Sequence, residues 1–189
     1  MNVKTLMSFL LIVGSMPLLA QKSYQLQSPD KVLHIQVDVD NDIKFSLTHH
    51  GTEVLAPSPI SMTLQDGEVL GANPKVSKVV KASVDRVIPS PFYKKSEIKD
   101  IYNEMTITFR GNYGIVFRLY NDGIAYRFVT KKKGDIIVAD EEASYNFSTD
   151  HKAFAAYVNS NAETFEKQFF NSFEQPYVNE PITKLNNKK

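Results

Sequence analysis

The sequence contains no cysteine, so no disulfide bond can stabilise its fold. It also lacks a hydrophobic run of the roughly 20 residues that a membrane-spanning helix needs. No internal repeat, low-complexity tract or interdomain linker is visible. At 189 residues the chain is large enough to bury a single core without covalent cross-links. We therefore expect one domain that depends on packing alone.

An excess of charge of either sign is missing too. The chain has 22 basic and 21 acidic residues, and removal of Lys4 with a leader would leave 22 − 1 = 21 of each. This balance argues against nucleic acid or anionic lipid as a partner. The one basic cluster, Lys131-Lys132-Lys133-Gly134, follows an expected strand and indicates a solvated turn.

The first twenty residues are typical of a secretory signal peptide. Lys4 precedes an apolar run at 6–13, and Leu18-Leu19-Ala20 follows, which predicts cleavage after Ala20 although Leu18 stands where a small residue is usual. The run is too short for a bilayer core of about 30 Å, which disfavours a transmembrane anchor. No cysteine is present for lipid attachment. We expect a periplasmic or secreted protein with no membrane anchor after cleavage.

Helical periodicity is almost absent, and short segments rich in β-branched and aromatic residues recur between turn residues. This pattern predicts an all-β fold, and many short antiparallel strands imply a sandwich or a barrel. The expected strands are 31–39, 43–48, 52–55, 60–64, 76–87, 101–110, 114–120, 124–129 and 154–158.

Four local patterns give more detailed predictions. Apolar and polar residues alternate in 31–39 and 43–48, which indicates a hairpin with one buried face. Pro57 and Pro59 are expected to separate two strands at a sheet edge or loop. Asn121-Asp122-Gly123 predicts a tight hairpin turn, with the glycine at positive φ. In the expected strand 101–110, Met105, Ile107 and Phe109 share one face.

Histidine and serine give little support for a metal site or a catalytic triad. His49 and His50 are adjacent on an expected strand and should face opposite ways, so they cannot easily bind one metal ion. His34 and His151 have no visible partner in the sequence. The serine-rich loops lack the pattern that surrounds a nucleophilic serine.

The segment from about residue 159 is polar, irregular and rich in carboxylates and aromatic rings. Such a set is typical of a sugar site, but ordinary domain docking or a frayed terminus also produces it. The spacing of the carboxylates does not define an acid and base pair. The residues are Glu163, Glu166, Glu174, Glu180, Tyr157, Phe165, Phe169, Phe170, Phe173 and Tyr177.

Four separated motifs carry a family resemblance. They are Leu26-Gln27-Ser28-Pro29-Asp30, Tyr102-Asn103-Glu104-Met105, residues 117–128, and Asn171-Ser172-Phe173-Glu174-Gln175-Pro176-Tyr177. In sequence, order and spacing they resemble the N-terminal domain of glycoside hydrolase family 97. That family comprises exported α-glucosidases and α-galactosidases typical of glycan-degrading Bacteroidetes.

The resemblance implies an antiparallel β-sandwich, a supersandwich like that of galactose mutarotases, packed in full-length members against a (β/α)8 barrel that holds the catalytic carboxylates. It also implies that Glu174 is a calcium ligand lent to the barrel's active site. The expected layout is a signal peptide over 1–20 and the family domain over 21–189, with a barrel-docking arm from about 159.

Two functions of different kinds are compatible with this layout. The first is a non-catalytic domain of a family 97 glycosidase, whose catalytic residues and most calcium ligands lie in a barrel that the sequence lacks. The second is a free-standing exported module that binds carbohydrate, such as an α-glucoside or α-galactoside, or another protein. An autonomous enzyme using Glu163, Glu166 or Glu174 is disfavoured, because the tail offers no rigid frame for a carboxylate pair.

Overall fold

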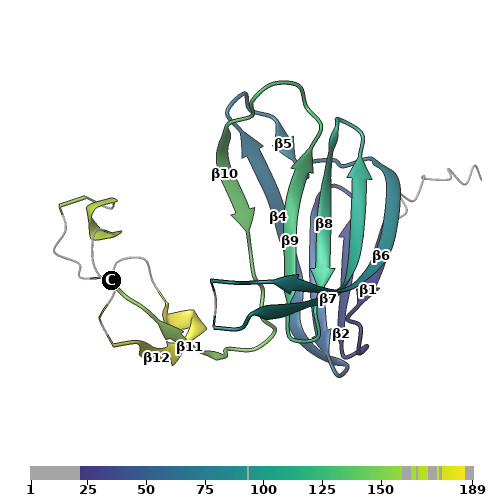
Figure 1. Ribbon diagram of the computed structural model, residues 1–189. Coiled ribbons are helices and arrows are strands. Elements are labelled where there is room, and N and C mark those ends of the chain that lie inside the picture. The colour runs from purple at the N-terminus through teal and green to yellow at the C-terminus, as the bar shows by residue number, and fades with distance from the viewer. Residues whose placement is uncertain are drawn as a thin grey trace, which may run out of the picture.

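The protein is described by a computed structural model that covers residues 22–92, 94–158, 163–164, 166–169, 174 and 176–185. The predicted signal peptide lies outside these residues. Two antiparallel sheets pack face to face, and a small two-stranded sheet lies to one side of them (Figure 1). The predicted all-β sandwich is confirmed.

The first sheet has the strand order β1-β2-β3-β4-β10, with the short β5 also paired to β4, and the second has the order β6-β7-β8-β9. All pairings are antiparallel. The strands are β1 (Lys22–Gln27), β2 (Leu33–Val39), β3 (Ile43–His49), β4 (Thr52–Leu64), β5 (Val69–Leu70), β6 (Val76–Pro89), β7 (Glu97–Phe109), β8 (Tyr113–Leu119), β9 (Ile124–Thr130), β10 (Val138–Ala143), β11 (Lys152–Ala155) and β12 (Val178–Pro181). Two short 3-10 helices, η1 (Glu166–Phe169) and η2 (Ile182–Lys184), lie in the C-terminal part.

The core lies between the two sheets and follows the alternation of the sequence. In β2 every second residue from Leu33 is buried, as the alternation predicted, and Met105, Ile107 and Phe109, which share one face of β7 as predicted, are buried too. Rings from the two sheets meet directly, with the centroids of Phe45 and Phe117 6.1 Å apart. Burial of this apolar surface provides the main stabilisation of a fold that has no cross-link.

The predicted break at Pro57 and Pro59 is wrong, because β4 runs without interruption through both residues. The pairing of β4 with β3 shifts register between Phe45 and Leu47, which places Pro57 at a bulge, where a missing N–H disturbs the ladder least, whereas Pro59 lies opposite Lys44 in the ladder. On the side of β4 away from β3, Asn146 forms an isolated bridge with Ala56 in place of a regular ladder. Its Nδ2 donates a 2.8 Å hydrogen bond to the Pro57 carbonyl oxygen.

The predicted β8–β9 hairpin is confirmed, but the positive φ predicted for Gly123 is wrong. The loop closes through a hydrogen bond of 2.8 Å from the Tyr120 N–H to the Gly123 carbonyl oxygen. Asn121 also has a role outside the turn, since its Oδ1 accepts a 3.1 Å hydrogen bond from the Asp30 N–H in the β1–β2 loop. The hairpin therefore ties the second sheet to the first.

Gly114 in β8 is required by a close approach between strands. A Cβ atom at this position would lie 2.8 Å from the Ile107 carbonyl oxygen of β7. Gly123, by contrast, has open space around the position of its missing Cβ. Only the first of these glycines is needed for packing.

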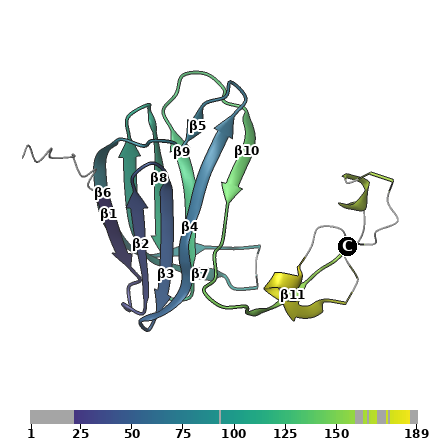
Figure 2. The ribbon, with the colours of Figure 1, turned by 180° about the vertical axis from the view of Figure 1, so that it is seen from behind.

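β7 begins at Glu97, four residues before the strand predicted from the sequence, and this extension forms a projecting ribbon. β8 ends where Leu119 pairs with Asn103, so residues 97–102 of β7 have β6 as their one described strand neighbour. We call the described residues 84–92 and 94–102 the hairpin arm. The arm leaves the sandwich on the side where β11 and β12 lie (Figures 1 and 2).

Candidate functional site

Glu174 lies exposed in the segment between η1 and β12. The three residues before it in the predicted calcium motif, 171–173, fall outside the described residues. Within the described part of the chain, no group of three or more His, Asp or Glu side chains is placed to hold a metal ion. Glu174 is thus a single carboxylate donor, whereas calcium takes six to eight oxygen ligands.

The other tail carboxylates do not gather around Glu174. Glu163 forms an ion pair of 2.5 Å with Lys167, one turn further on. Glu180, on β12, accepts a hydrogen bond from the Tyr157 hydroxyl. The structure therefore gives Glu163 and Glu180 other partners, and within the part of the tail that it describes it places no group of three or more acids together.

The tail is tied back after Glu174. β12 pairs with β11, from Lys152 opposite Pro181 to Ala155 opposite Val178. Asp150 accepts hydrogen bonds from the backbone N–H of Thr183 at 3.1 Å and from its hydroxyl at 2.9 Å. These bonds hold the pKa of the Asp150 carboxyl below its usual value. Glu174 consequently lies on a connection whose far end is fixed.

A cluster that the sequence reasoning missed lies on the outer face of the second sheet, the face turned away from the first sheet. The Arg118 guanidinium lies 4.4 Å from the Tyr102 ring centroid, and its Nε donates a 2.8 Å hydrogen bond to the Glu104 carboxylate. The Tyr102 and Tyr120 rings are 5.1 Å apart. Tyr102 is buried although it faces outward, because its neighbours cover it.

The same cluster continues into the base of the hairpin arm. Arg86 Nε donates a 2.8 Å hydrogen bond to Asp100 Oδ2, and the side chain of Asp100 is only 11% exposed. The Tyr120 hydroxyl lies 3.4 Å from the other oxygen of this carboxylate. Each carboxylate therefore already has a partner, and Glu104 raises the pKa of Arg118 further above its ordinary value. This arrangement suits a mechanical anchor better than proton transfer.

A cavity of about 530 Å³ opens beside the β7–β8 turn. Its surface is mainly apolar, and its lining also includes Gly114, several hydroxyl groups and two cations, which could form hydrogen bonds with a polar ligand. The polar lining residues are Ser77, Thr106, Thr108, Arg110, Asn112, Thr130 and Lys131.

The histidines have partners or turn positions that the sequence did not reveal. His50 has a φ of 50°, so it turns back and its ring centroid lies 4.5 Å from that of His49; the predicted opposite orientation is wrong. His34 contacts the Lys31 carbonyl oxygen at 2.8 Å, and His151 contacts the Thr149 hydroxyl at 2.8 Å. All four remain poor candidates for catalysis.

The lysine cluster at 131–133 is only partly the solvated turn that was predicted. Lys132 forms a 2.6 Å ion pair with Glu68, and its side chain is 21% exposed. This pair joins the chain after β9 to the β4–β5 turn, so Lys132 acts as a structural tie.

The arrangement of the strands defines the chain as an antiparallel β-sandwich domain with a projecting arm. Comparison with known families narrows this class. The Glycosyl-hydrolase 97 N-terminal family matches residues 26–189, and the chain belongs to that family, which confirms the resemblance seen in the sequence.

Relatives extend this result. The chain is 41% identical over 186 residues to a retaining alpha-galactosidase of Bacteroides thetaiotaomicron, an alignment that covers 97% of the chain and 28% of that protein. The fold also matches a solved beta-arabinopyranosidase, with a TM-score of 0.69 and 22% identity over 82% of this chain and 26% of that one. A glycoside hydrolase family 97 enzyme from Pseudoalteromonas sp. strain K8, in complex with acarbose, matches with a TM-score of 0.56 and 22% identity over 62% of this chain and 19% of that one.

These proportions bear directly on function. The chain spans little more than a quarter of the length of the curated relative that it matches. It corresponds to the N-terminal domain of family 97 enzymes and to a fraction of their length. In the described residues, no helix is long and apolar enough to cross a membrane.

Proposed function

We propose that this domain has no catalytic activity of its own, and that it docks on a (β/α)8 barrel and completes a calcium-dependent α-glycosidase active site. The alignment with the retaining alpha-galactosidase carries the proposal, because it extends over 97% of the chain and 28% of that protein. A relationship that covers one whole domain of a larger enzyme favours a shared position in the assembly.

The chemistry of Glu174 supports a role as one calcium ligand among several. Calcium is a hard cation that prefers carboxylate and carbonyl oxygens, and an exposed glutamate can supply one or two of them. Because the described residues offer no cluster around Glu174, the other ligands would come from the partner domain. When bound, the ion would supply positive charge close to the sugar and would join the two domains.

The substrate class follows from the same relationship. An α-galactoside is the first choice, since the curated relative is a retaining alpha-galactosidase, and an α-glucoside is the second. Hydrolysis requires two carboxyl groups at a defined separation across a cleft. Those groups belong to the barrel in this proposal. Export to the periplasm or beyond, through the leader at residues 1–20, is part of it.

A chimera tests the proposal. Residues 21–189 would replace the corresponding part of the Bacteroides alpha-galactosidase, and calcium affinity would be measured by calorimetry together with hydrolysis of an aryl α-galactoside. We expect Glu174→Gln to weaken calcium binding at least tenfold and to lower activity in parallel. Glu163→Gln is the matched control, because Glu163 is an exposed tail acid already paired with Lys167. Equal calcium affinity in the wild-type chimera and Glu174→Gln would contradict the role of Glu174.

The cavity beside the β7–β8 turn favours a second candidate, a module that binds carbohydrate without a barrel. Its hydroxyl-rich rim could bind sugar hydroxyl groups. Calorimetric titration of the chain alone with α-glucosides and α-galactosides separates the two. Affinity that is lost in Thr108→Val would support the module, and no detectable binding supports the docked domain.

A further inference from the structure

The hairpin arm ends in an apolar tip that nothing covers in the described structure. Phe92 is fully exposed, and Ile88 and Ile98, which pair across the two strands, are 40% and 39% exposed. Phe92 follows Pro91, whose ring fixes its own backbone φ. A large aromatic side chain left in water at the end of a projecting element is typical of an interaction surface.

The arm is held rigidly at its base, which distinguishes it from a mobile loop. A two-stranded ribbon is only marginally stable by itself in water. Here the Arg86–Asp100 pair joins the two strands of the arm, and the Tyr120 hydroxyl and the Arg118–Tyr102 contact bind its root to the sheet. At its end, the Ser90 N–H donates a 2.8 Å hydrogen bond to the Ser96 carbonyl oxygen and closes the ribbon. A preorganised arm loses little entropy on docking.

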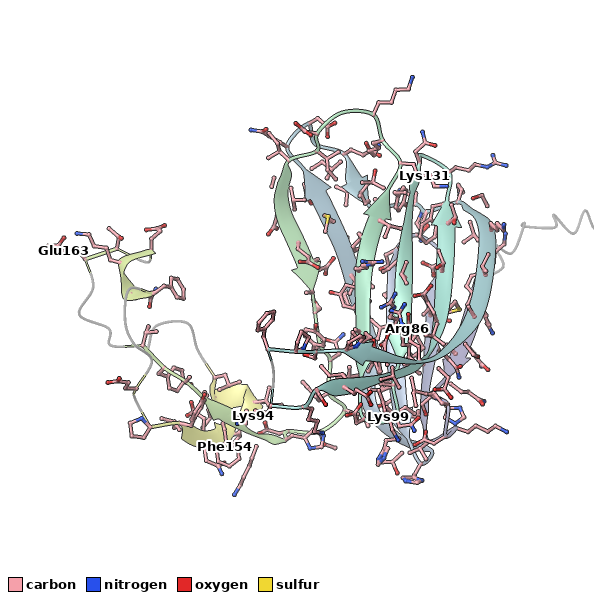
Figure 3. All side chains as sticks on the ribbon, viewed as in Figure 1. Arg86, Lys94, Lys99, Lys131, Phe154 and Glu163 are labelled. Carbon is pink, nitrogen blue, oxygen red and sulfur yellow. The ribbon has the colours of Figure 1, made fainter. Side chains whose placement is uncertain are left out.

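The length and the net charge of the arm indicate the kind of surface that it contacts. Six residues of β7, 97–102, extend past the end of β8, which carries the tip about 20 Å beyond the sheet. Beyond the Arg86–Asp100 pair the arm has Lys94, Lys95 and Lys99 against Glu97, a net charge of 3 − 1 = +2. Figure 3 shows Arg86 near the base and Lys94 towards the far end. The tip is thus apolar and basic in a chain that is otherwise almost neutral.

We propose that the hairpin arm is a docking prong that inserts Phe92 into an apolar hollow, bordered by carboxylates, on the catalytic domain. The inference rests on the proposed docking on a barrel and adds the surface that makes the contact. Glycosidase clefts are acidic, since they carry at least two carboxyl groups and here a calcium site as well. A basic, apolar tip complements such a rim. The arm and the β11–β12 sheet project on the same side of the sandwich, so one partner domain can contact both (Figures 1 and 2).

Hydrogen–deuterium exchange on the chain alone and on the chimera described above tests the prong. We expect the amides of the arm and of β12 to exchange at least tenfold more slowly in the chimera. Protection of β12 without protection of the arm would overturn the prong and leave the proposed function standing. Protection of neither segment would overturn the docking itself, and the prong with it.

A pair of variants makes the test specific. Phe92→Ser should leave the melting temperature of the chain alone unchanged, because the side chain is fully exposed. In the chimera it should make the amides of the arm exchange at least tenfold faster than in the wild-type chimera. Val69→Ser is the control, since Val69 is an exposed apolar residue on β5, at the other end of the sandwich (Figure 1). Equal arm protection in Phe92→Ser and in the wild-type chimera would contradict the prong.

Two other binding partners of the tip, a lipid surface and a second copy of the chain, can be tested directly. Sedimentation of the chain alone with vesicles of phosphatidylglycerol and phosphatidylcholine, abolished by Phe92→Ser, would assign the tip to a lipid surface instead. Light scattering that shows a dimer of the wild type and a monomer of Phe92→Ser would assign it to a second copy of the chain. Either result would overturn the prong; a monomer that stays in the supernatant supports it.

Discussion

Replacement of Gly114 by alanine should destabilise the sandwich by about 2 kcal/mol, because the new methyl group collides with backbone and not with a flexible side chain. Its Cβ would lie 2.8 Å from the Ile107 carbonyl oxygen and 3.4 Å from the Thr108 Cα. The contact must lengthen by several tenths of an ångström, in a region where Gly114 and Thr108 are paired in the ladder. Overpacking of this kind costs about 1–3 kcal/mol.

The expected net value includes a smaller opposing effect. Alanine restricts the unfolded chain more than glycine does, which stabilises a protein by about 0.4–1 kcal/mol where the native φ is compatible. Gly123→Ala isolates that effect, since Gly123 has neither a positive φ nor a neighbour near the missing Cβ. We expect Gly123→Ala to be neutral or slightly stabilising.

Urea denaturation followed by circular dichroism measures both variants, with thermal melts in parallel. A loss of 2 kcal/mol corresponds to a fall in melting temperature of about 4–8 °C for a domain of this size. The slope of unfolding free energy against urea should not change, because the exposed surface is the same. If Gly114→Ala and Gly123→Ala had the same midpoint, the close approach of β7 and β8 at this point would be refuted.

Three further predictions concern single side chains. Burial raises the pKa of the Tyr126 hydroxyl, so the stabilisation that this side chain provides is complete below about pH 10 and declines as the pH rises toward the folded-state pKa. The difference in unfolding free energy between wild type and Tyr126→Phe should therefore narrow above about pH 10, and a constant difference in urea titrations would contradict this. Arg86→Ala should lower the free energy of unfolding by about 2 kcal/mol, because it leaves the nearly buried Asp100 carboxylate without its cation, whereas Lys94→Ala should change that free energy by less than about 0.5 kcal/mol. Equal urea midpoints for the two variants would refute the anchoring role of the Arg86–Asp100 pair. Asn121→Ala should lower the free energy of unfolding by about 1 kcal/mol through loss of its hydrogen bond to the β1–β2 loop, whereas Asp122→Ala, in the same turn, should leave it almost unchanged. If Asp122→Ala lowered the melting temperature more than Asn121→Ala, the hydrogen bond between this turn and the first sheet would be refuted.

Strands with one buried face could be predicted from the sequence, because apolar and polar residues alternate along them. β2, β3, β8 and β9 have that pattern or a continuous apolar run, and they lie within one or two residues of their expected positions. β10 lacks it, since all of its residues are exposed. It is held by backbone pairing with β4, a partner some eighty residues away that no local pattern reveals.

The candidate sites depend even more on long-range placement. The Arg118 cluster joins side chains from β6, β7 and the end of β8, and only the register of those strands brings Arg86, Tyr102 and Arg118 together. The start of β7 at Glu97 was missed because lysine and glutamate give a weak strand signal. Glu174 came from a family motif and not from local chemistry, so its role stays a prediction.

β10 has a consequence for the behaviour of the domain in solution. It lies at the outer edge of the first sheet, where unpaired N–H and C=O groups can recruit a strand from another molecule. Asp140, Glu141 and Glu142 give this edge three consecutive negative charges. A second β10 edge approaching it would meet the same charges, so repulsion opposes pairing of the two edges. A strand whose residues are all exposed therefore opposes growth of the sheet at this edge.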